Sequence, residues 1–328
     1  MAAPIIHPCC DPSAPSVIWE GTPTGRVIEV EGIEIYISQP RRGSEGSSTE
    51  AAATSQKTSP TAAMRVILFL TEGHGIYLPN AQLLADSFAS HLNCDVLMPD
   101  EFAGQPRLPK DINITGAESS IIPAATATVP WIEDPTDPNF EIRGLQVPVK
   151  ENPESSDAYR FMKPPWWRDQ VSAEEFEKWK KRHEPEITDP ILATVVRFIH
   201  SEYGKEVRIG GVGYCFGGRY VMRLMGQGIV EVGVVNHPSF FTMEEVGRLA
   251  GKGMKLACFA AETDDILPAE KRREMEDVLV RNGSTWMSTV FSGTKHGFSV
   301  RGDLSVKEVR LAKERAFRGA VEWFKDWL

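Results

Sequence analysis

The chain has 328 residues, 41% of them hydrophobic, and a formal net charge of −9 at neutral pH. This length fits one large α/β domain or two small ones, and the apolar content is ample for a buried core. The negative charge argues against nucleic acid or an anionic membrane as a partner, and no apolar run approaches the roughly 20 residues that span a bilayer.

The N-terminus and the cysteines favour a cytoplasmic protein without a metal centre. Residues 1–8 lack both the basic region and the apolar core of a secretory signal. Five cysteines are an odd number scattered along the chain, which suits a reducing compartment better than a disulfide framework. No Cys/His cluster has zinc spacing.

The first segments of the chain predict a hairpin and then a tether. Residues 26–31 and 33–38 alternate apolar and polar side chains around Glu31-Gly32, which indicates an antiparallel hairpin at a sheet edge. Residues 41–62 hold almost nothing that can be buried. We interpret them as a flexible polar loop.

Residues 64–70 are almost continuously apolar, as in a parallel strand covered on both faces. This strand brings Thr71-Glu72-Gly73-His74-Gly75 to the carboxyl edge of the sheet, where α/β proteins place their sites. The patterns that follow predict a helix over 80–92 and a strand over 95–98.

Between residues 101 and 188 the regular alternation lapses. A connection of this length in a regular α/β pattern favours a lid-like insertion over the active edge rather than a separate domain. The insertion contains a pattern that predicts a helix near 172–182, and it contains the adjacent residues Trp166 and Trp167. These tryptophans are candidates to line a substrate pocket, and packing the insertion onto the body is the alternative.

The alternation resumes after the insertion and predicts one α/β domain with a doubly wound, mostly parallel sheet. The predicted elements are helices over 190–203, 216–225, 242–250, 268–281 and 305–327 and strands over 207–212, 231–235, 255–260 and 285–291.

The strand over 207–212 ends in Gly213-x-Cys215-x-Gly217, the form of a nucleophile elbow. The elbow forces the central residue into strained backbone angles, and the glycines give strand and helix room to approach. A dinucleotide-binding loop is the alternative, but its third glycine would fall at Phe216. Cys215 would stand at a helix N-terminus, which stabilises a thiolate, and is therefore the candidate nucleophile.

Two later strand ends supply a base and an acid in the order nucleophile, acid, histidine. His296 follows the strand over 285–291, and Asp264 and Asp265 follow the strand over 255–260. His296 can take the thiol proton and activate water, and the acid would orient the ring. Asp265 is the competing acid, with capping of the next helix as its alternative role.

The oxyanion hole is expected to combine the N–H groups of Phe216 and Gly73. We interpret His74 as shaping the loop of the oxyanion hole, and His237 as hydrogen-bonding locally after its strand.

The sequence resembles the dienelactone hydrolase family, including its fungal members. The motifs that carry this likeness are Gly213-Tyr214-Cys215-Phe216-Gly217-Gly218, Asp264-x-x-Leu267-Pro268 and His296-Gly297-Phe298, together with Cys9-Cys10, Glu20 to Gly25 and Leu78 to Asp86. The resemblance implies an α/β-hydrolase fold and a Cys-Asp-His triad of Cys215, Asp264 and His296, which favours Asp264 over Asp265.

The resemblance also assigns two charged residues. Glu72 matches an acid that pairs with the resting cysteine and shifts its protonation, and Arg301 is the nearest candidate to bind a substrate carboxylate. We expect a hydrolase of an ester, lactone or thioester, on a bulky aromatic or polyketide-type small molecule, with no cofactor, as a monomer or homodimer. The alternatives are acyl transfer to a second substrate and a non-catalytic ligand-binding protein.

Overall fold

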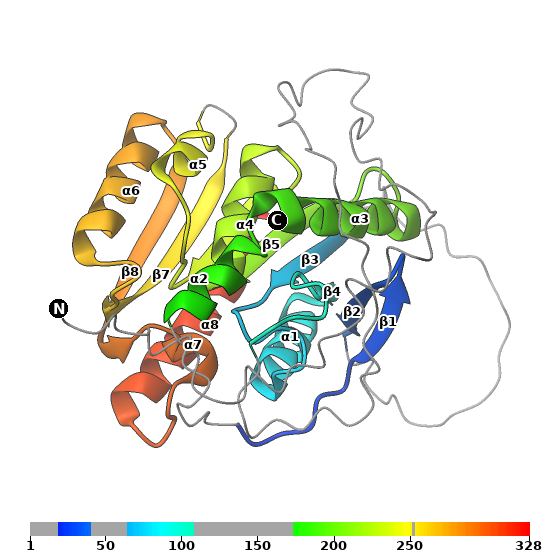
Figure 1. The fold of residues 1–328 in the computed structure, drawn as a ribbon, viewed down its shortest axis with the longest axis horizontal. Helices are drawn as coiled ribbons and strands as arrows, with labels where there is room; N and C mark the ends of the chain where they lie inside the picture. Colours follow the sequence, from blue (N-terminus) through cyan, green and yellow to red (C-terminus); the bar gives the residue numbers. More distant parts are fainter. Residues whose placement is uncertain (1–18, 41–63, 108–172, 251–252) are drawn as a thin grey trace, which may run out of the picture.

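The computed structural model describes residues 19–40, 64–107, 173–250 and 253–328, with side chains from residue 176 onward in the third range (Figure 1). The polar loop predicted over 41–62, the tryptophans Trp166 and Trp167 and the centre of the insertion lie outside these ranges. The predictions made for them stay predictions.

An eight-stranded sheet forms the centre of the described chain, in the order β1-β2-β4-β3-β5-β6-β7-β8. The strands are β1 (Arg26–Val30), β2 (Ile33–Ser38), β3 (Arg65–Leu70), β4 (Asp95–Pro99), β5 (Arg208–Tyr214), β6 (Val232–Asn236), β7 (Lys255–Thr263) and β8 (Thr285–Lys295). Strand β2 is antiparallel to β1 and β4, and the other neighbours are parallel. The predicted edge hairpin and mostly parallel sheet are confirmed.

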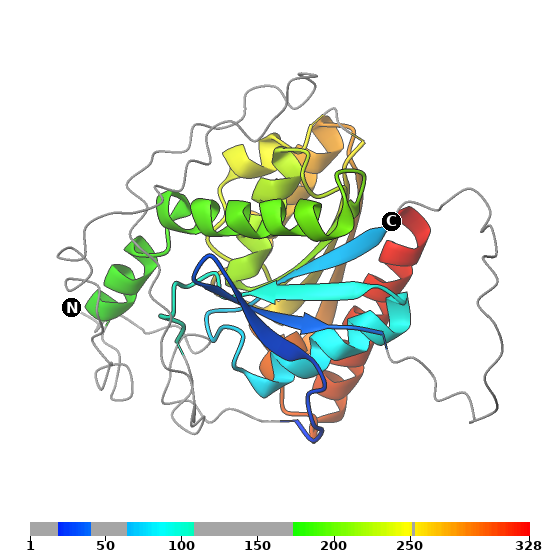
Figure 2. The same ribbon diagram turned by 90° about the vertical axis from the view of Figure 1, so that its right-hand side faces the viewer.

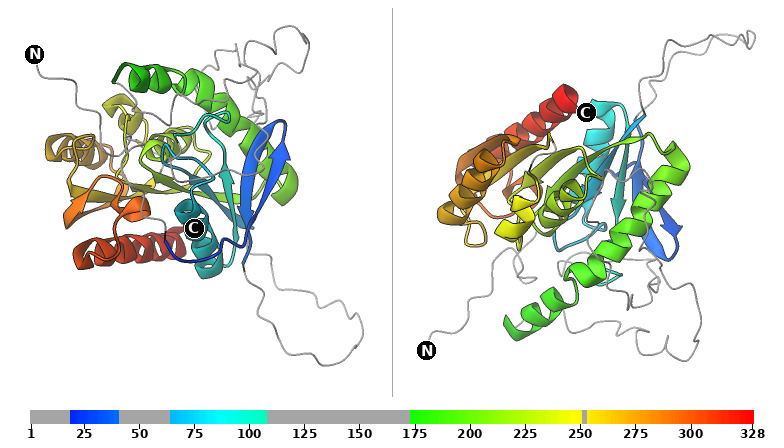
Figure 3. Two further views of the ribbon diagram at one scale, coloured as in Figure 1. Left: turned by 60° about the horizontal axis from the view of Figure 1, so that its bottom comes forward. Right: turned by 90° about the horizontal axis from the view of Figure 1, so that it is seen from above.

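Helices cover both faces of this sheet (Figure 3). They are α1 (Pro79–Leu92), α2 (Ala173–Lys181), α3 (Pro185–Tyr203), α4 (Phe216–Gly226), α5 (Met243–Gly247), α6 (Ala269–Arg281), α7 (Phe298–Arg301) and α8 (Lys307–Trp327). Helices α3, α4, α5 and α6 pack on one face, and α1 and α8 on the other. This is the α/β-hydrolase arrangement.

Strand β3 shows why its sequence is continuously apolar. Val66, Leu68 and Leu70 belong to the core under α3 and α4, whereas Ile67 and Phe69 belong to the core under α1 and α8. All five are fully buried. Because both faces are covered, the usual alternation of apolar and polar residues disappears.

Helix α3 begins at Pro185, five residues before its predicted start, so Pro190 lies inside the helix. Proline suits a first turn, and the chain offers two; Pro185 occupies that position. Figure 2 shows α2 next to the N-terminal end of α3. The short helix α7 was not predicted, because four residues are too few for a periodic pattern.

Both described ends of the predicted insertion belong to the core. Glu101 and Phe102 are fully buried after β4, and Trp179 of α2 is 3% exposed. In the described part of the chain, no helix is both long and apolar enough to cross a membrane.

Candidate active site

Cys215 lies at the junction of β5 and α4 with φ 49° and ψ −108°, a strained conformation for a non-glycine residue. A β-carbon on Gly213 would lie 2.5 Å from the carbonyl oxygen of Gly217, and one on Gly217 would lie 2.4 Å from the backbone of Leu70. The two glycines therefore stand where the sharp turn from strand to helix leaves no room for a side chain.

Asp264 and His296 are in contact at the ends of β7 and β8. Asp264 Oδ2 lies 2.7 Å from His296 Nδ1, and its Oδ1 accepts hydrogen bonds from the N–H groups of Ile266 and Leu267 at 2.9 and 3.0 Å. Asp265 is exposed, and no side chain caps the start of α6. Of the two candidate acids, Asp264 is the one that holds the ring.

The His296 side chain is 6% exposed. Burial disfavours its protonation, but the nearby Cys215 thiolate and the hydrogen bond with Asp264 outweigh burial and raise the pKa of His296 to about 10. Nε2 is buried, and both the charge of Cys215 and its side-chain hydrogen bond with the ring contribute to the raised pKa of His296. The structure brings Cys215, His296 and Asp264 together from three strand ends.

Glu72 lies just past β3 and is 2% exposed. Both its carboxylate oxygens accept hydrogen bonds of 2.8 Å from Arg301 Nε in α7. Burial raises the pKa of Glu72, Arg301 lowers it, and the charge of Cys215 raises it again. Since Arg301 is engaged with Glu72 here, its predicted binding of a substrate carboxylate stays a prediction.

The loop after β3 is tied to the elbow by backbone hydrogen bonds. Gly217 N donates to Thr71 O at 2.9 Å, and Arg107 N donates to Gly73 O at 2.6 Å. His74 Nδ1 contacts the carbonyl oxygen of Arg107, and burial lowers the pKa of His74 to about 3. These contacts place Gly73 beside the first turn of α4, where Phe216 begins the helix.

An aromatic wall flanks Gly73. A β-carbon on Gly73 would lie 3.5 Å from Trp179 Cη2. The Trp179 ring stacks on Phe102 and Phe176 with centroid separations of 5.6 and 6.1 Å, and it meets Phe216 at 5.7 Å. Two predicted oxyanion donors therefore lie against aromatic surface from the ends of the insertion.

Sequence reasoning missed Glu101. Its Oε1 accepts hydrogen bonds from Thr71 N and Thr71 Oγ1 at 2.6 and 3.0 Å, whereas Oε2 is buried without a hydrogen bond to a described residue. Burial raises the pKa of Glu101 well above its usual value, and the charge of Cys215 adds to this rise. Its place just after the strand over 95–98 was the available signal.

His237 hydrogen-bonds with its own backbone, as interpreted from the sequence, and it also contacts α7. His237 Nε2 lies 2.8 Å from Ser299 Oγ in α7, and the rings of His237 and His296 meet edge to face at 4.8 Å. Burial lowers the pKa of His237 well below its usual value. Ser239, also missed, places Oγ 3.3 Å from Cys215 Sγ.

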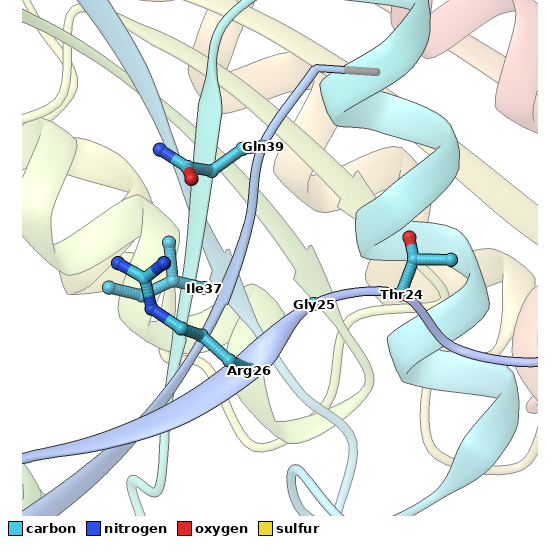
Figure 4. Close-up of a pocket in the computed structure, with 5 residues that line it drawn as sticks. All are labelled: Thr24, Gly25, Arg26, Ile37 and Gln39. Carbon is cyan, nitrogen blue, oxygen red and sulfur yellow. The ribbon is translucent and has the colours of Figure 1, made fainter. Parts of the chain in front are cut away.

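The described residues of this site include no metal-binding cluster, and the surface hollow in Figure 4 lies elsewhere. Among the described residues, no three His, Cys, Asp or Glu side chains are grouped so that they could hold a metal ion. The hollow is lined by Thr24, Gly25, Arg26, Ile37 and Gln39 (Figure 4). The hollow lies at β1 and the end of β2. Because the end of β2 pairs with the start of β4, the hollow is at the sheet edge opposite the carboxyl edge that carries Cys215.

Comparison with known proteins gives a family and a fold. A model of the dienelactone hydrolase family matches residues 52–328. The hydrolase tropI of Talaromyces stipitatus is 32% identical over 94% of this chain and 92% of its own, and the hydrolase pyvD of Aspergillus violaceofuscus is 30% identical over 94% and 93%. The crystal structure of a dienelactone hydrolase from Anabaena variabilis has a TM-score of 0.50 at 10% identity, covering 93% of this chain and 99% of that one. At such low identity the structural likeness concerns the fold.

Proposed function

Because this chain belongs to the dienelactone hydrolase family and is a hydrolase, we propose that it cleaves an ester, lactone or thioester bond through an acyl-cysteine intermediate. The observation that carries the proposal is the strained Cys215 elbow beside the hydrogen-bonded pair of His296 and Asp264.

In the first half of the reaction, the Cys215 sulfur attacks the carbonyl carbon and the carbonyl oxygen becomes an oxyanion. The N–H groups of Phe216 and Gly73 stabilise this charge. The intermediate collapses, the bond to the leaving group breaks, and the His296 imidazolium gives its proton to the leaving atom. Asp264 keeps Nδ1 protonated, so that Nε2 faces the reaction.

In the second half, His296 takes a proton from a water molecule that attacks the thioester carbonyl. A second oxyanion forms and collapses, the carbon–sulfur bond breaks, and the acid product leaves. The proton on His296 then balances the thiolate, which restores the starting pair.

Glu72 tunes the resting nucleophile in this proposal. Its carboxyl is buried, has a raised pKa and is held by Arg301. When the sulfur carries its proton, a carboxylate that loosens from Arg301 as substrate enters can accept that proton, which restores the charged sulfur.

We propose an aromatic or other bulky apolar acyl group as the substrate class. The support is the partly exposed Phe176, which stacks on the buried aromatic cluster beside Gly73, because flat apolar groups gain most from stacking on such rings. We also propose Trp166 and Trp167 as substrate-binding residues.

The test is the turnover of an activated aryl ester by Cys215→Ala. We expect a loss of roughly 10⁴-fold or more, as for other nucleophile deletions. Cys258→Ala, which changes a buried cysteine in β7, is the matched control and should keep its rate. Turnover that survives in Cys215→Ala would refute the acyl-cysteine route. Product analysis with an added amine separates hydrolysis from acyl transfer.

A further inference from the structure

The turn after β6, residues 236–239, is fastened to the nucleophile from both sides. Cys215 N donates to Asn236 O at 3.0 Å, and Ser239 N donates to Cys215 O at 2.9 Å. The backbone of the turn and that of the elbow therefore keep one relative position.

The same turn is strained and closely packed. His237 and Phe240 have φ angles of 38° and 60°, which non-glycine residues rarely adopt and which tend to gather at functional sites. A β-carbon on Gly218 would lie 2.7 Å from Pro238 Cβ, so the turn presses against the first turn of α4. Ser239 lies between these two strained residues, so the fold holds it in one place.

The Ser239 side chain points to the sulfur. Ser239 is fully buried, and its Oγ lies 3.3 Å from Cys215 Sγ. We propose that the Ser239 hydroxyl donates a hydrogen bond to the Cys215 thiolate and so favours the charged form of the nucleophile. This inference rests on the proposed function, in which that thiolate attacks the substrate.

The direction of the effect follows from the chemistry of the two atoms. A thiolate has no proton, so the hydroxyl must be the donor, and a hydrogen bond to a charged acceptor is stronger than one to a neutral thiol. Removing the hydroxyl therefore costs the thiolate more than the thiol, which raises the pKa of Cys215.

Other groups around the sulfur do not make this donor redundant. The titratable and charged side chains about Cys215 and its partners include Glu72, Glu101, His74, His237, Asp264, His296 and Arg301. The imidazolium of His296 favours the thiolate, whereas the buried carboxyls of Glu72 and Glu101 oppose it when ionised. Because these charges act on the sulfur in opposite directions, a hydrogen-bond donor at 3.3 Å has a measurable effect.

The experiment measures the rate at which iodoacetamide alkylates Cys215, identified by peptide mass spectrometry, as a function of pH. For Ser239→Ala we expect the midpoint to rise by roughly one pH unit, with alkylation about tenfold slower below the midpoint and unchanged above it. Ser38→Ala, which removes a buried hydroxyl from β2, is the matched control and should follow the wild-type curve.

Ser239→Thr keeps a hydroxyl at this position and should stay close to the wild-type midpoint. A Ser239→Ala curve that coincides with wild type, a loss of equal size at every pH, or a threonine variant that behaves like alanine would each overturn the proposal. Because alkylation needs no turnover, the result is independent of the Cys215→Ala ester assay, which tests the proposed function itself.

Discussion

Two buried clusters of charge, one along α4 and one beside its N-terminal end, differ in how their charges are matched. The rear cluster joins α3, α4 and α5: Arg219 bonds to Glu245 and Glu184 at 3.0 Å each, and Arg223 bonds to Glu245 at 2.6 Å and to Asp189. In the front cluster Glu72 forms an ion pair with Arg301, and the Cys215 sulfur and the His296 ring lie nearby.

In the rear cluster each arginine serves two carboxylates, and burial of the ions is offset by many well-formed bonds. In the front cluster the described hydrogen bonds to Glu72 come from Arg301, and the pKa of Glu72 responds to the charge of the Cys215 sulfur. A closed network of ion pairs fixes helices, whereas a buried carboxyl next to a nucleophilic sulfur can exchange a proton with it. Changes at the rear should cost stability, and changes at the front should cost activity.

The largest effect is expected at the acid of the front site. Asp264→Asn should lower kcat by roughly 10⁴-fold, because an amide stabilises the wrong tautomer of His296. Asp265→Asn, a change of the same kind at an exposed neighbour, should leave kcat within a factor of about two. Equal losses in both variants would contradict the assignment of Asp264.

Glu245→Gln tests the rear cluster. Removing one carboxylate from between two buried arginines should lower the free energy of unfolding by about 3–5 kcal/mol, measured by urea denaturation. The folded variant should keep its kcat. A normal stability with a reduced kcat would reverse the proposed division between the clusters.

Glu72→Gln sharpens the comparison at the front. The change leaves the Arg301 cation near the sulfur without a carboxylate to oppose it, so the thiol should ionise more readily and react faster with iodoacetamide at neutral pH. Turnover should nevertheless fall by roughly tenfold, because the group that accepts the thiol proton is gone. If alkylation and turnover fell together, Glu72 would have only a structural role.

A further test is the pH dependence of stability. The pKa of His296 is raised in the folded protein to about 10 from a usual value near 6.5, so its stabilising contribution is complete below about pH 6.5 and is lost as pH rises towards 10. Wild type should therefore lose stability relative to His296→Gln across this range. Cys215→Ala removes the thiolate that favours the imidazolium, and its loss should occur at lower pH.

The positions that were predictable from sequence are those where a local pattern has one physical solution. Gly213 and Gly217 predict the elbow because no side chain fits at these positions. The apolar run of β3 predicts a strand that is buried on both faces. His237 and Ser239 carried no such signal, since their partners lie on α7 and at the end of β5. Contacts between segments distant in sequence need the assembled sheet to become visible.

The bond between Glu72 and Arg301 joins residues that are 229 positions apart in the sequence. During synthesis Cys215 is made before His296 and Arg301, so a nascent chain carries the thiol without its base and without the cation that holds Glu72. Such a cysteine behaves as an ordinary thiol, with little thiolate to be oxidised. In the proposed mechanism, the thiolate that oxidants attack therefore forms only when the last strand and α7 are in place, inside the finished core.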